Sequence, residues 1–278
     1  VGLDITSSRT KLHDTPACDR ELLDNDPLGL HHTYSWNYRA VVGSLSYLQA
    51  MIRPDLTMSV QQCARFCNAP QQQHAVALKR ICRYLLKTHD LGLTFRPDPS
   101  RGLECYVDAD WAGSWKQRSS SDPLSARSRS GYVIMYAGCP IVWASKIQTL
   151  VALSTTEAEY IALSSSLREV IAIMNLMNEL TDRGFTLNRS TPKVHCTVFE
   201  DNRSCIEIAT NHRTRPRTKH LSVRLHHFHS HILAKTISIQ HISTKNQIAD
   251  IFTKPLPRDQ FILLRSKFMG WGSLAVRE

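Results

Sequence analysis

The sequence predicts an α/β fold in which a mixed five-stranded sheet is flanked by helices and preceded by a small helical subdomain. Three observations predict it. Five segments have the composition of strands, at 103–110, 131–137, 141–147, 193–200 and 236–242. Segments with helical spacing of apolar residues follow the third strand and flank the fifth strand on both sides. The predicted order of elements is therefore β-β-β-α-β-α-α-β-α. Before residue 100 the spacing of apolar residues is mainly helical.

Composition bounds the class of protein. At 278 residues the chain can form one large or two smaller domains, and its formal net charge of +10 favours a polyanionic partner such as nucleic acid. The eight cysteines are scattered and form no C-x-x-C pair, so we expect reduced, buried thiols in an intracellular protein. No signal peptide and no long apolar run is present, so we expect no membrane partner, and the missing initiator Met indicates a fragment of a larger protein.

The helical subdomain is expected at 36–99, after a polar linker or arm at 1–35. A first helix begins near Trp36 and ends before Arg53-Pro54-Asp55, and a second runs from Leu56 to about Asn68. A third, from about Gln73 to Lys87, is expected to carry Val76, Leu78, Ile81, Leu85 and Leu86 on one side. Its Lys and Arg residues lie elsewhere on its surface, for which a solvated face and a nucleic-acid contact are equally good interpretations. We also expect a short strand at 91–95 and a domain boundary at 96–100, where Pro residues cluster.

The second part, 100–270, carries the strands, and 271–278 is a tail. A hairpin turn is expected at Gly138-Cys139-Pro140 and a mobile loop at 115–130. A long helix from about Thr155 to Leu180 begins with a capping box of Ser154 and Glu157. Further helices are expected at 202–210, around Leu221, Leu225, Phe228 and Ile232, and from about Asn246.

Four acids lie at strand ends or helix starts in this second part: Asp108, Glu159, Asp201 and Asp250. Two Mg²⁺ ions held by carboxylates from separate segments can activate a water and stabilise a leaving oxygen in phosphodiester hydrolysis. The four acids therefore predict a metal site for cleaving a nucleic-acid backbone, with Mn²⁺ able to substitute.

Neighbouring acids compete with three of these positions. Asp110 shares a strand face with Asp108, so either can be the ligand. Glu157 is accounted for as a capping residue, which leaves Glu159. Glu200 and Asp201 point to opposite faces, so only one of them faces the site.

The motifs around the acids resemble the ribonuclease H domain of copia-type retrotransposon Pol polyproteins. They are Tyr-Val-Asp108-Ala-Asp-Trp-Ala-Gly, Ser-Thr-Thr-Glu-Ala-Glu159-Tyr-Ile-Ala-Leu, Glu-Asp201-Asn, Gln-Ile-Ala-Asp250-Ile-Phe-Thr-Lys, Trp143-Ala-Ser-Lys146 and Arg217-Thr-Lys-His220. Upstream, Tyr38-Arg-Ala-Val-Val-Gly-Ser-Leu-Ser-Tyr47-Leu and Arg53-Pro54-Asp55 resemble the helical thumb or connection region that closes such a reverse transcriptase.

The resemblance implies a ribonuclease H-like fold and Mg²⁺-dependent cleavage of the RNA strand of RNA–DNA hybrids during reverse transcription. By motif position it implies Asp108, Glu159, Asp201 and Asp250 as catalytic metal ligands. It also implies the rest of the Pol polyprotein, with its polymerase domain, as a partner. Two departures matter. The loop before Asp250 lacks the His of many cellular relatives, and the Tyr-x-Asp-Asp motif of the polymerase palm is missing, so we expect no DNA synthesis.

Two basic features complete the prediction. The connector residues Arg213, Arg215, Arg217 and Lys219 are candidates for contacting the phosphates of the hybrid. The cluster His226, His227, His229 and His231 favours a solvated or phosphate-contacting face over a metal site, because no acid or Cys lies nearby. Two other functions compete with this one. The first is a catalytically inactive nucleic-acid-binding or connection module, or a remnant of a retroelement. The second is a DNA strand-transferase of related fold, but the motifs around Asp201 and Asp250 fit that function poorly.

Overall fold

The computed structural model describes residues 11–18, 22–25, 28–117, 122–187, 194–210 and 227–271. The chain divides into two compact units, here called the helical unit and the sheet unit. The helical unit comprises Val1–Thr94, Ala112–Arg127 and Lys254–Glu278, and the sheet unit comprises Phe95–Trp111 and Ser128–Thr253. The division into linker, helical region, ribonuclease H-like region and tail stays a prediction.

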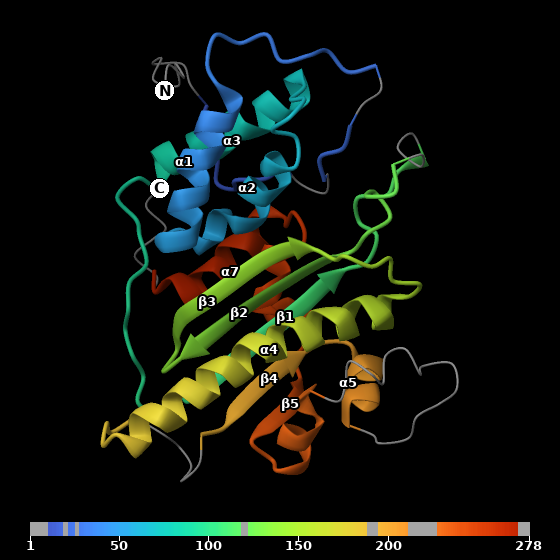
Figure 1. Ribbon diagram of the computed structural model, residues 1–278. Coiled ribbons are helices and arrows are strands. Elements are labelled where there is room, and N and C mark those ends of the chain that lie inside the picture. The colour runs from blue at the N-terminus through green and yellow to red at the C-terminus, as the bar shows by residue number, and fades with distance from the viewer. Residues whose placement is uncertain are drawn as a thin grey trace. The chain divides into compact units, whose positions relative to one another are not determined.

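The sheet unit contains a five-stranded sheet in the order β3-β2-β1-β4-β5 (Figure 1). The strands are β1 (Leu103–Asp110), β2 (Arg129–Tyr136), β3 (Cys139–Ile147), β4 (Cys196–Glu200) and β5 (Ile237–His241). β1 pairs antiparallel with β2 and β2 with β3, whereas β1–β4 and β4–β5 are parallel. The sheet is therefore mixed, which confirms the predicted fold class.

The turn between β2 and β3 differs from the prediction by two residues. Ala137 and Gly138 both have positive φ, of 50° and 74°, as the two central residues of a type I′ hairpin turn require. Cys139 and Pro140 already belong to β3. Gly138 tolerates this backbone because it has no Cβ, and the predicted turn at 138–140 was therefore placed too late.

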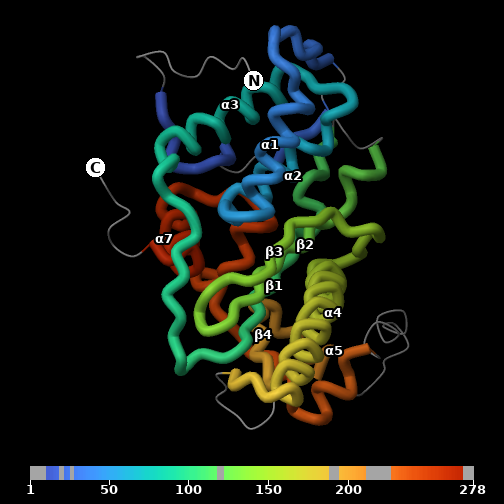
Figure 2. Tube along the Cα trace, turned by 60° about the vertical axis from the view of Figure 1, so that its left-hand side comes forward, coloured from blue at the N-terminus to red at the C-terminus, as the bar shows by residue number. Residues whose placement is uncertain are grey.

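Two helices cover one face of the sheet. α4 (Thr155–Asp182) packs against β1 and β2, and α5 (Arg203–Thr210) packs against α4, β4 and β5 (Figure 2). Alternate β1 residues, among them Cys105 and Val107, meet buried α4 residues such as Leu163 and Leu167 in one core. These helices confirm the long and short helices expected at about 155–180 and 202–210.

The segment after β5 forms two short 3₁₀-helices, where a single short helix was expected. They are η4 (Thr244–Asn246) and η5 (Ile248–Phe252), and η5 packs against β1 and β2. The side chain of Tyr132 in β2 lies in the core with α4, so its neighbour Gly131 faces the opposite side of the sheet. A Cβ on Gly131 would meet Phe252, which places η5 on the face opposite α4.

The helical unit confirms the three predicted helices and adds another. It contains α1 (Tyr38–Met51), η1 (Pro54–Leu56), α2 (Thr57–Ala64), α3 (Gln72–Lys87) and α7 (Arg258–Met269). α2 ends earlier than expected, at Ala64. α7 was not predicted: its buried residues Phe261, Leu264 and Phe268 do have helical spacing, but the buried Arg265 and the exposed Leu263 obscure this stripe in the sequence.

Two further expectations in this unit are wrong. Residues 91–95 form no strand, although the Thr94 N–H donates to the carbonyl oxygen of Met269 at 3.0 Å. In α3 the buried face is centred on Leu78, Ile81 and Tyr84, while Val76 is 54% exposed. A single helix cannot bury both Val76 and Leu78, since they lie about 200° apart around its axis.

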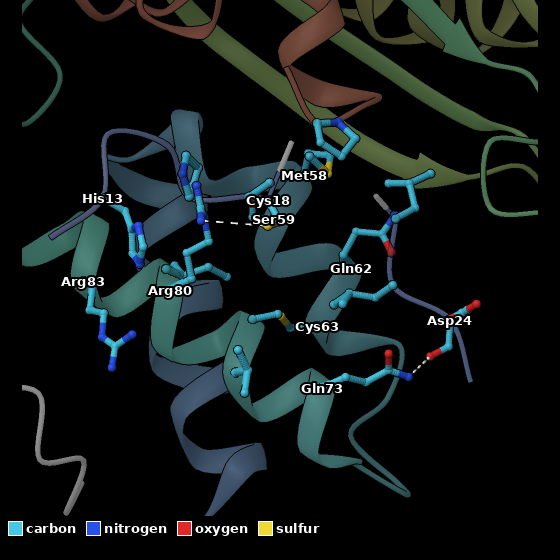
Figure 3. Close-up of a pocket in the computed structure, with 18 of the residues that line it drawn as sticks. His13, Cys18, Asp24, Met58, Ser59, Gln62, Cys63, Gln73, Arg80 and Arg83 are labelled. Atoms are coloured by element: carbon cyan, nitrogen blue, oxygen red, sulfur yellow. Dashed lines mark hydrogen bonds between the residues drawn. The ribbon is translucent and has the colours of Figure 1, made fainter. Parts of the chain in front are cut away.

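A cavity of about 710 Å³ lies in the helical unit beside α2 and α3 (Figure 3). Its lining includes His13 and Cys18 from the N-terminal segment, Cys63 from α2, and Arg80 and Arg83 from α3. None of the four predicted site acids lines it. The cavity is therefore a feature of the helical unit separate from those acids.

The eight cysteines are free thiols, and five of them are buried, whereas Cys18 is exposed and Cys67 and Cys82 are half-buried. Among the described residues, no helix combines the length and the apolar character needed to cross a membrane.

Candidate metal centre

Asp108 lies near the end of the central strand of the sheet. β1 runs between β2 and β4, and Asp108 pairs with Gly131 of β2. The Asp108 side chain is 2% exposed, and its Oδ2 accepts a hydrogen bond from the hydroxyl of Thr253. The strand therefore holds a carboxylate inside the protein, just beyond Tyr106, the last residue of β1 that pairs with β4.

Glu159 lies in the second turn of α4, and the start of that helix is fixed by side-chain caps. Ser154 is the N-cap, and its Oγ accepts from the backbone N–H of Glu157 at 3.2 Å. The carboxylate of Glu157 accepts from the N–H of Leu153 at 2.9 Å. The capping bonds fix where α4 begins, and the packing of α4 on β1 and β2 buries Glu159.

Asp201 follows β4 directly. It is half-buried, and its Oδ2 accepts from the hydroxyl of Thr244 at 2.8 Å. The preceding residue, Glu200, is fully buried, and its Oε1 accepts from the N–H of Asn202 at 3.0 Å. Burial raises the pKa of Glu200 well above its usual range, and the nearby negative charges of Asp108 and Asp201 raise it further.

Three of the four predicted acids converge. Asp108, Glu159 and Asp201 each offer a carboxylate oxygen, and these oxygens lie within 4.8 Å of one another. They come from a strand, a helix and a strand end that are distant in sequence. The alternatives Asp110, Glu157 and Glu200 do not belong to this group in the part of the chain that the structure describes. The donors are all carboxylate oxygens, the hard ligands that Mg²⁺ and Mn²⁺ accept.

Asp250 is not part of that group. It lies in η5, is 3% exposed, and its backbone carbonyl accepts from the N–H of Thr253 at 3.2 Å. Its role as the fourth ligand stays a prediction.

The basic and histidine clusters are only partly visible. Arg213, Arg215, Arg217, Lys219 and also His226, Leu221 and Leu225 lie outside the described residues. Residues 227–233 are helical, and Nδ1 of His231 lies 3.1 Å from the Thr236 hydroxyl. No His-containing metal group occurs among the described residues.

Sequence reasoning missed two residues that contact the strands of the site. Gln247 is fully buried, and its Nε2 donates to the carbonyl oxygens of Val107 at 2.9 Å and Phe199 at 3.3 Å. Thr253 is also fully buried and donates to Asp108. Both lie in the Gln-Ile-Ala-Asp-Ile-Phe-Thr motif, but uncharged polar residues in a short motif do not reveal which distant groups they contact.

Comparisons with known proteins point to one family. The chain is similar to the retrovirus-related Pol polyprotein from transposon RE1 of Arabidopsis thaliana, with 36% identity over 230 residues, or 83% of this chain and 14% of that protein. It is 37% identical over 229 residues to the corresponding polyprotein from transposon TNT 1-94 of Nicotiana tabacum, covering 82% of this chain and 16% of that protein. The chain thus spans a small part of these relatives.

Among solved structures, LC11-RNase H1, isolated from compost, covers 55% of this chain and 93% of its own, with 17% identity and a TM-score of 0.37. No model of a known protein family matches the chain. The similarity to the polyproteins over most of the length of the chain shows that it belongs to the family of Pol polyproteins of copia-type retrotransposons.

Proposed function

We propose that the sheet unit is a ribonuclease that hydrolyses the RNA strand of RNA–DNA hybrids during retrotransposon reverse transcription. The observation that carries this proposal is the convergence of Asp108, Glu159 and Asp201, whose carboxylate oxygens lie within 4.8 Å of one another. Three carboxylates so close repel one another strongly unless a cation or protons compensate their charge. A site of this kind in a ribonuclease H-like fold suits metal-assisted phosphodiester hydrolysis.

The donor set fits divalent cations. Asp108, Glu159 and Asp201 would hold them, with Asp250 as the proposed fourth ligand and Mg²⁺, two ions, as the proposed metal, for which Mn²⁺ can substitute. When bound, such ions supply charge stabilisation for the attacking and leaving oxygens of the phosphodiester.

The chain's own residues contribute position and access. Asp201 is half-buried and keeps an oxygen near solvent, where a phosphate of the hybrid can approach. Its hydrogen bond from Thr244 fixes the orientation of the carboxylate. Asp108 and Glu159 are buried and lie on the protein side of the site, on β1 and α4, which pack in the hydrophobic core. This arrangement favours a preorganised acidic centre open on one side.

The proposed partners are an RNA–DNA hybrid and the rest of the Pol polyprotein. The net charge of +10 favours binding of a polyanion. Arg213, Arg215, Arg217 and Lys219 are proposed to contact phosphates of the hybrid, which makes binding weaken as the salt concentration rises.

Cleavage of a labelled RNA–DNA hybrid by the full chain in Mg²⁺ tests the proposal. Wild type should cut the RNA strand, and Asp108→Asn should reduce the rate by at least about a hundredfold, because a metal ligand is worth several kcal/mol. Asp182→Asn is the matched control, since Asp182 is exposed at the far end of α4, and it should cut at the wild-type rate. Hybrid binding without cleavage by wild type would overturn the proposal in favour of an inactive binding module.

A further inference from the structure

Thr253 connects the last predicted acid motif to the first. It is fully buried, and its hydroxyl donates to Oδ2 of Asp108, 145 residues away in the sequence. The same hydroxyl lies 3.2 Å from the carbonyl oxygen of Asp250. A hydroxyl has one proton, and a carboxylate is the stronger acceptor, so Asp108 is the main partner.

The backbone opposite Asp108 has a space that Thr253 fills. Asp108 pairs with Gly131 in β2, and a Cβ on Gly131 would lie 2.6 Å from Cγ2 of Thr253 and 2.7 Å from Cβ of Phe252. Such distances are too short for carbon atoms. The missing side chain of Gly131 therefore lets Thr253 approach the strand, so that its methyl group packs against Gly131 while its hydroxyl reaches Asp108.

Thr253 ends a turn that begins at Gln247, and hydrogen bonds also fix the position of Gln247. The buried amide of Gln247 donates to the carbonyl of Val107, just before Asp108, and to that of Phe199 in β4. The turn from Gln247 to Thr253 is thus attached to both strands that lead to the acids. Its position relative to Asp108 is fixed at two points.

We propose that Thr253 is a positioning residue that holds the Asp108 carboxylate in the orientation needed to share a cation with Glu159 and Asp201. This inference rests on the proposed function. Without the hydroxyl, the Asp108 carboxylate rotates about its Cβ–Cγ bond to move away from the two neighbouring negative charges. The cation must then reorder it, and that ordering weakens binding of the metal.

Two matched pairs of variants isolate the hydroxyl. Thr253→Val keeps the shape of the side chain and removes the hydroxyl. Thr253→Ser and Thr253→Ala both lack the methyl group and differ by the hydroxyl alone. Thr181→Val is the control, because the Thr181 hydroxyl donates to the Met177 carbonyl within α4, roughly 33 Å along the helix from Glu159.

The readout is binding of Mn²⁺ to the full chain, followed by electron paramagnetic resonance of the free ion, beside hybrid cleavage at increasing Mg²⁺. We expect Thr253→Val and Thr253→Ala to weaken Mn²⁺ binding by about 10- to 100-fold, the range for partners of metal ligands. Thr253→Ser and Thr181→Val should bind like wild type. High Mg²⁺ should restore much of the cleavage by Thr253→Val.

Equal Mn²⁺ affinity in both members of each pair would overturn the inference while leaving the proposed function intact. Absence of Mn²⁺ binding and of cleavage in wild type would instead contradict the proposed function. Thermal unfolding shows whether each variant is folded. If Thr253→Val does not fold, the Ser and Ala variants decide the question, because both leave the same small gap.

Discussion

Glu200 and Asp201 are consecutive residues whose carboxylates have opposite environments. Glu200 ends β4, is fully buried, and accepts from the N–H of Asn202. Asp201 is half-buried, accepts from Thr244, and belongs to the group with Asp108 and Glu159. Asp201 lies just beyond β4, where the chain bends, so the two carboxylates have different surroundings, although the charges of Asp108 and Asp201 still raise the pKa of Glu200.

This relationship predicts different effects of two similar substitutions. Asp201→Asn should reduce hybrid cleavage by at least about a hundredfold, since it removes a charged, proposed metal ligand, which is worth several kcal/mol. Glu200→Gln should keep cleavage within about threefold, because burial already favours the uncharged carboxyl and Gln is uncharged and nearly the same size. Single-turnover cleavage rates measure both. A large loss in Glu200→Gln with normal stability would assign Glu200 to the site instead.

His74 predicts a pH dependence of the helical unit. Its Nδ1 accepts from the N–H of Gln71 at 3.0 Å, so the proton is on Nε2, which lies 2.8 Å from the Asp24 carbonyl. Burial lowers the pKa of His74, and the charge of Arg65 lowers it too. Because the pKa of His74 is lower in the folded chain, neutral His74 stabilises the folded state at pH above its unfolded pKa of about 6.5. This stabilisation is lost as pH falls through the pKa of His74 in the folded chain.

Amide hydrogen exchange of α3 peptides should therefore be faster below about pH 6.5 than the intrinsic pH dependence of exchange explains. The extra rate corresponds to a loss of local stability of up to about 1.4 kcal/mol per pH unit. His74→Gln is the control, because glutamine does not titrate in this range. An identical pH dependence in wild type and His74→Gln would show that His74 is not the responsible group.

The buried ion pair of the helical unit predicts a large stability effect. Arg53 donates to both carboxylate oxygens of Asp55 at 2.9 Å, and the Tyr84 hydroxyl donates to Oδ2 of Asp55 at 2.5 Å. Asp55→Ala leaves the buried guanidinium of Arg53 without its partner and should cost about 3–5 kcal/mol. Tyr84→Phe removes two hydrogen bonds, the one donated to Asp55 and the one accepted from Nη1 of Arg265 at 2.7 Å, and should cost about 1–3 kcal/mol. Urea unfolding measures the free energy of unfolding of both variants. Equal losses would contradict the expectation that Asp55 contributes more to stability than the Tyr84 hydroxyl.

Gly131→Ala tests the close packing of η5 on the sheet. The new Cβ would lie 2.6 Å from Thr253 and 2.7 Å from Phe252, and both neighbours are buried. Overpacking of this kind should cost about 1–3 kcal/mol or more and displace the turn that contacts Asp108. Thermal unfolding measures the cost. Gly43→Ala in α1 is the control. Nothing lies within 4 Å of a Cβ on Gly43, so this substitution should not destabilise the chain.

Local patterns in the sequence predicted most of the elements. The spacing of Val41, Val42 and Leu45 gave α1, and strand-like composition gave the five strands. Prediction failed where local signals conflict: in α7 the exposed Leu263 and the buried Arg265 obscure the apolar stripe, and residues 91–95 resemble a strand but pair with none.

The acids were predicted from motifs, but their geometry was not. Resemblance pointed to Asp108, Glu159, Asp201 and Asp250, and the structure brings the first three within 4.8 Å. Asp108 and Asp110 share a strand face but lie about 7 Å apart along it, so only the position of Glu159 and Asp201 along β1 decides that Asp108 is the one that joins them.

The sequence by itself determined the type and order of the elements and the acidic motifs, because helix caps, turn residues and apolar periodicity act over a few residues. Only the tertiary structure decided which groups meet across long separations. The contacts of Thr253 with Asp108 and of Gln247 with Val107 and Phe199 join residues that no local pattern relates. Such contacts form only when strands and turn pack together, since each hydrogen bond needs its buried partner within about 3 Å.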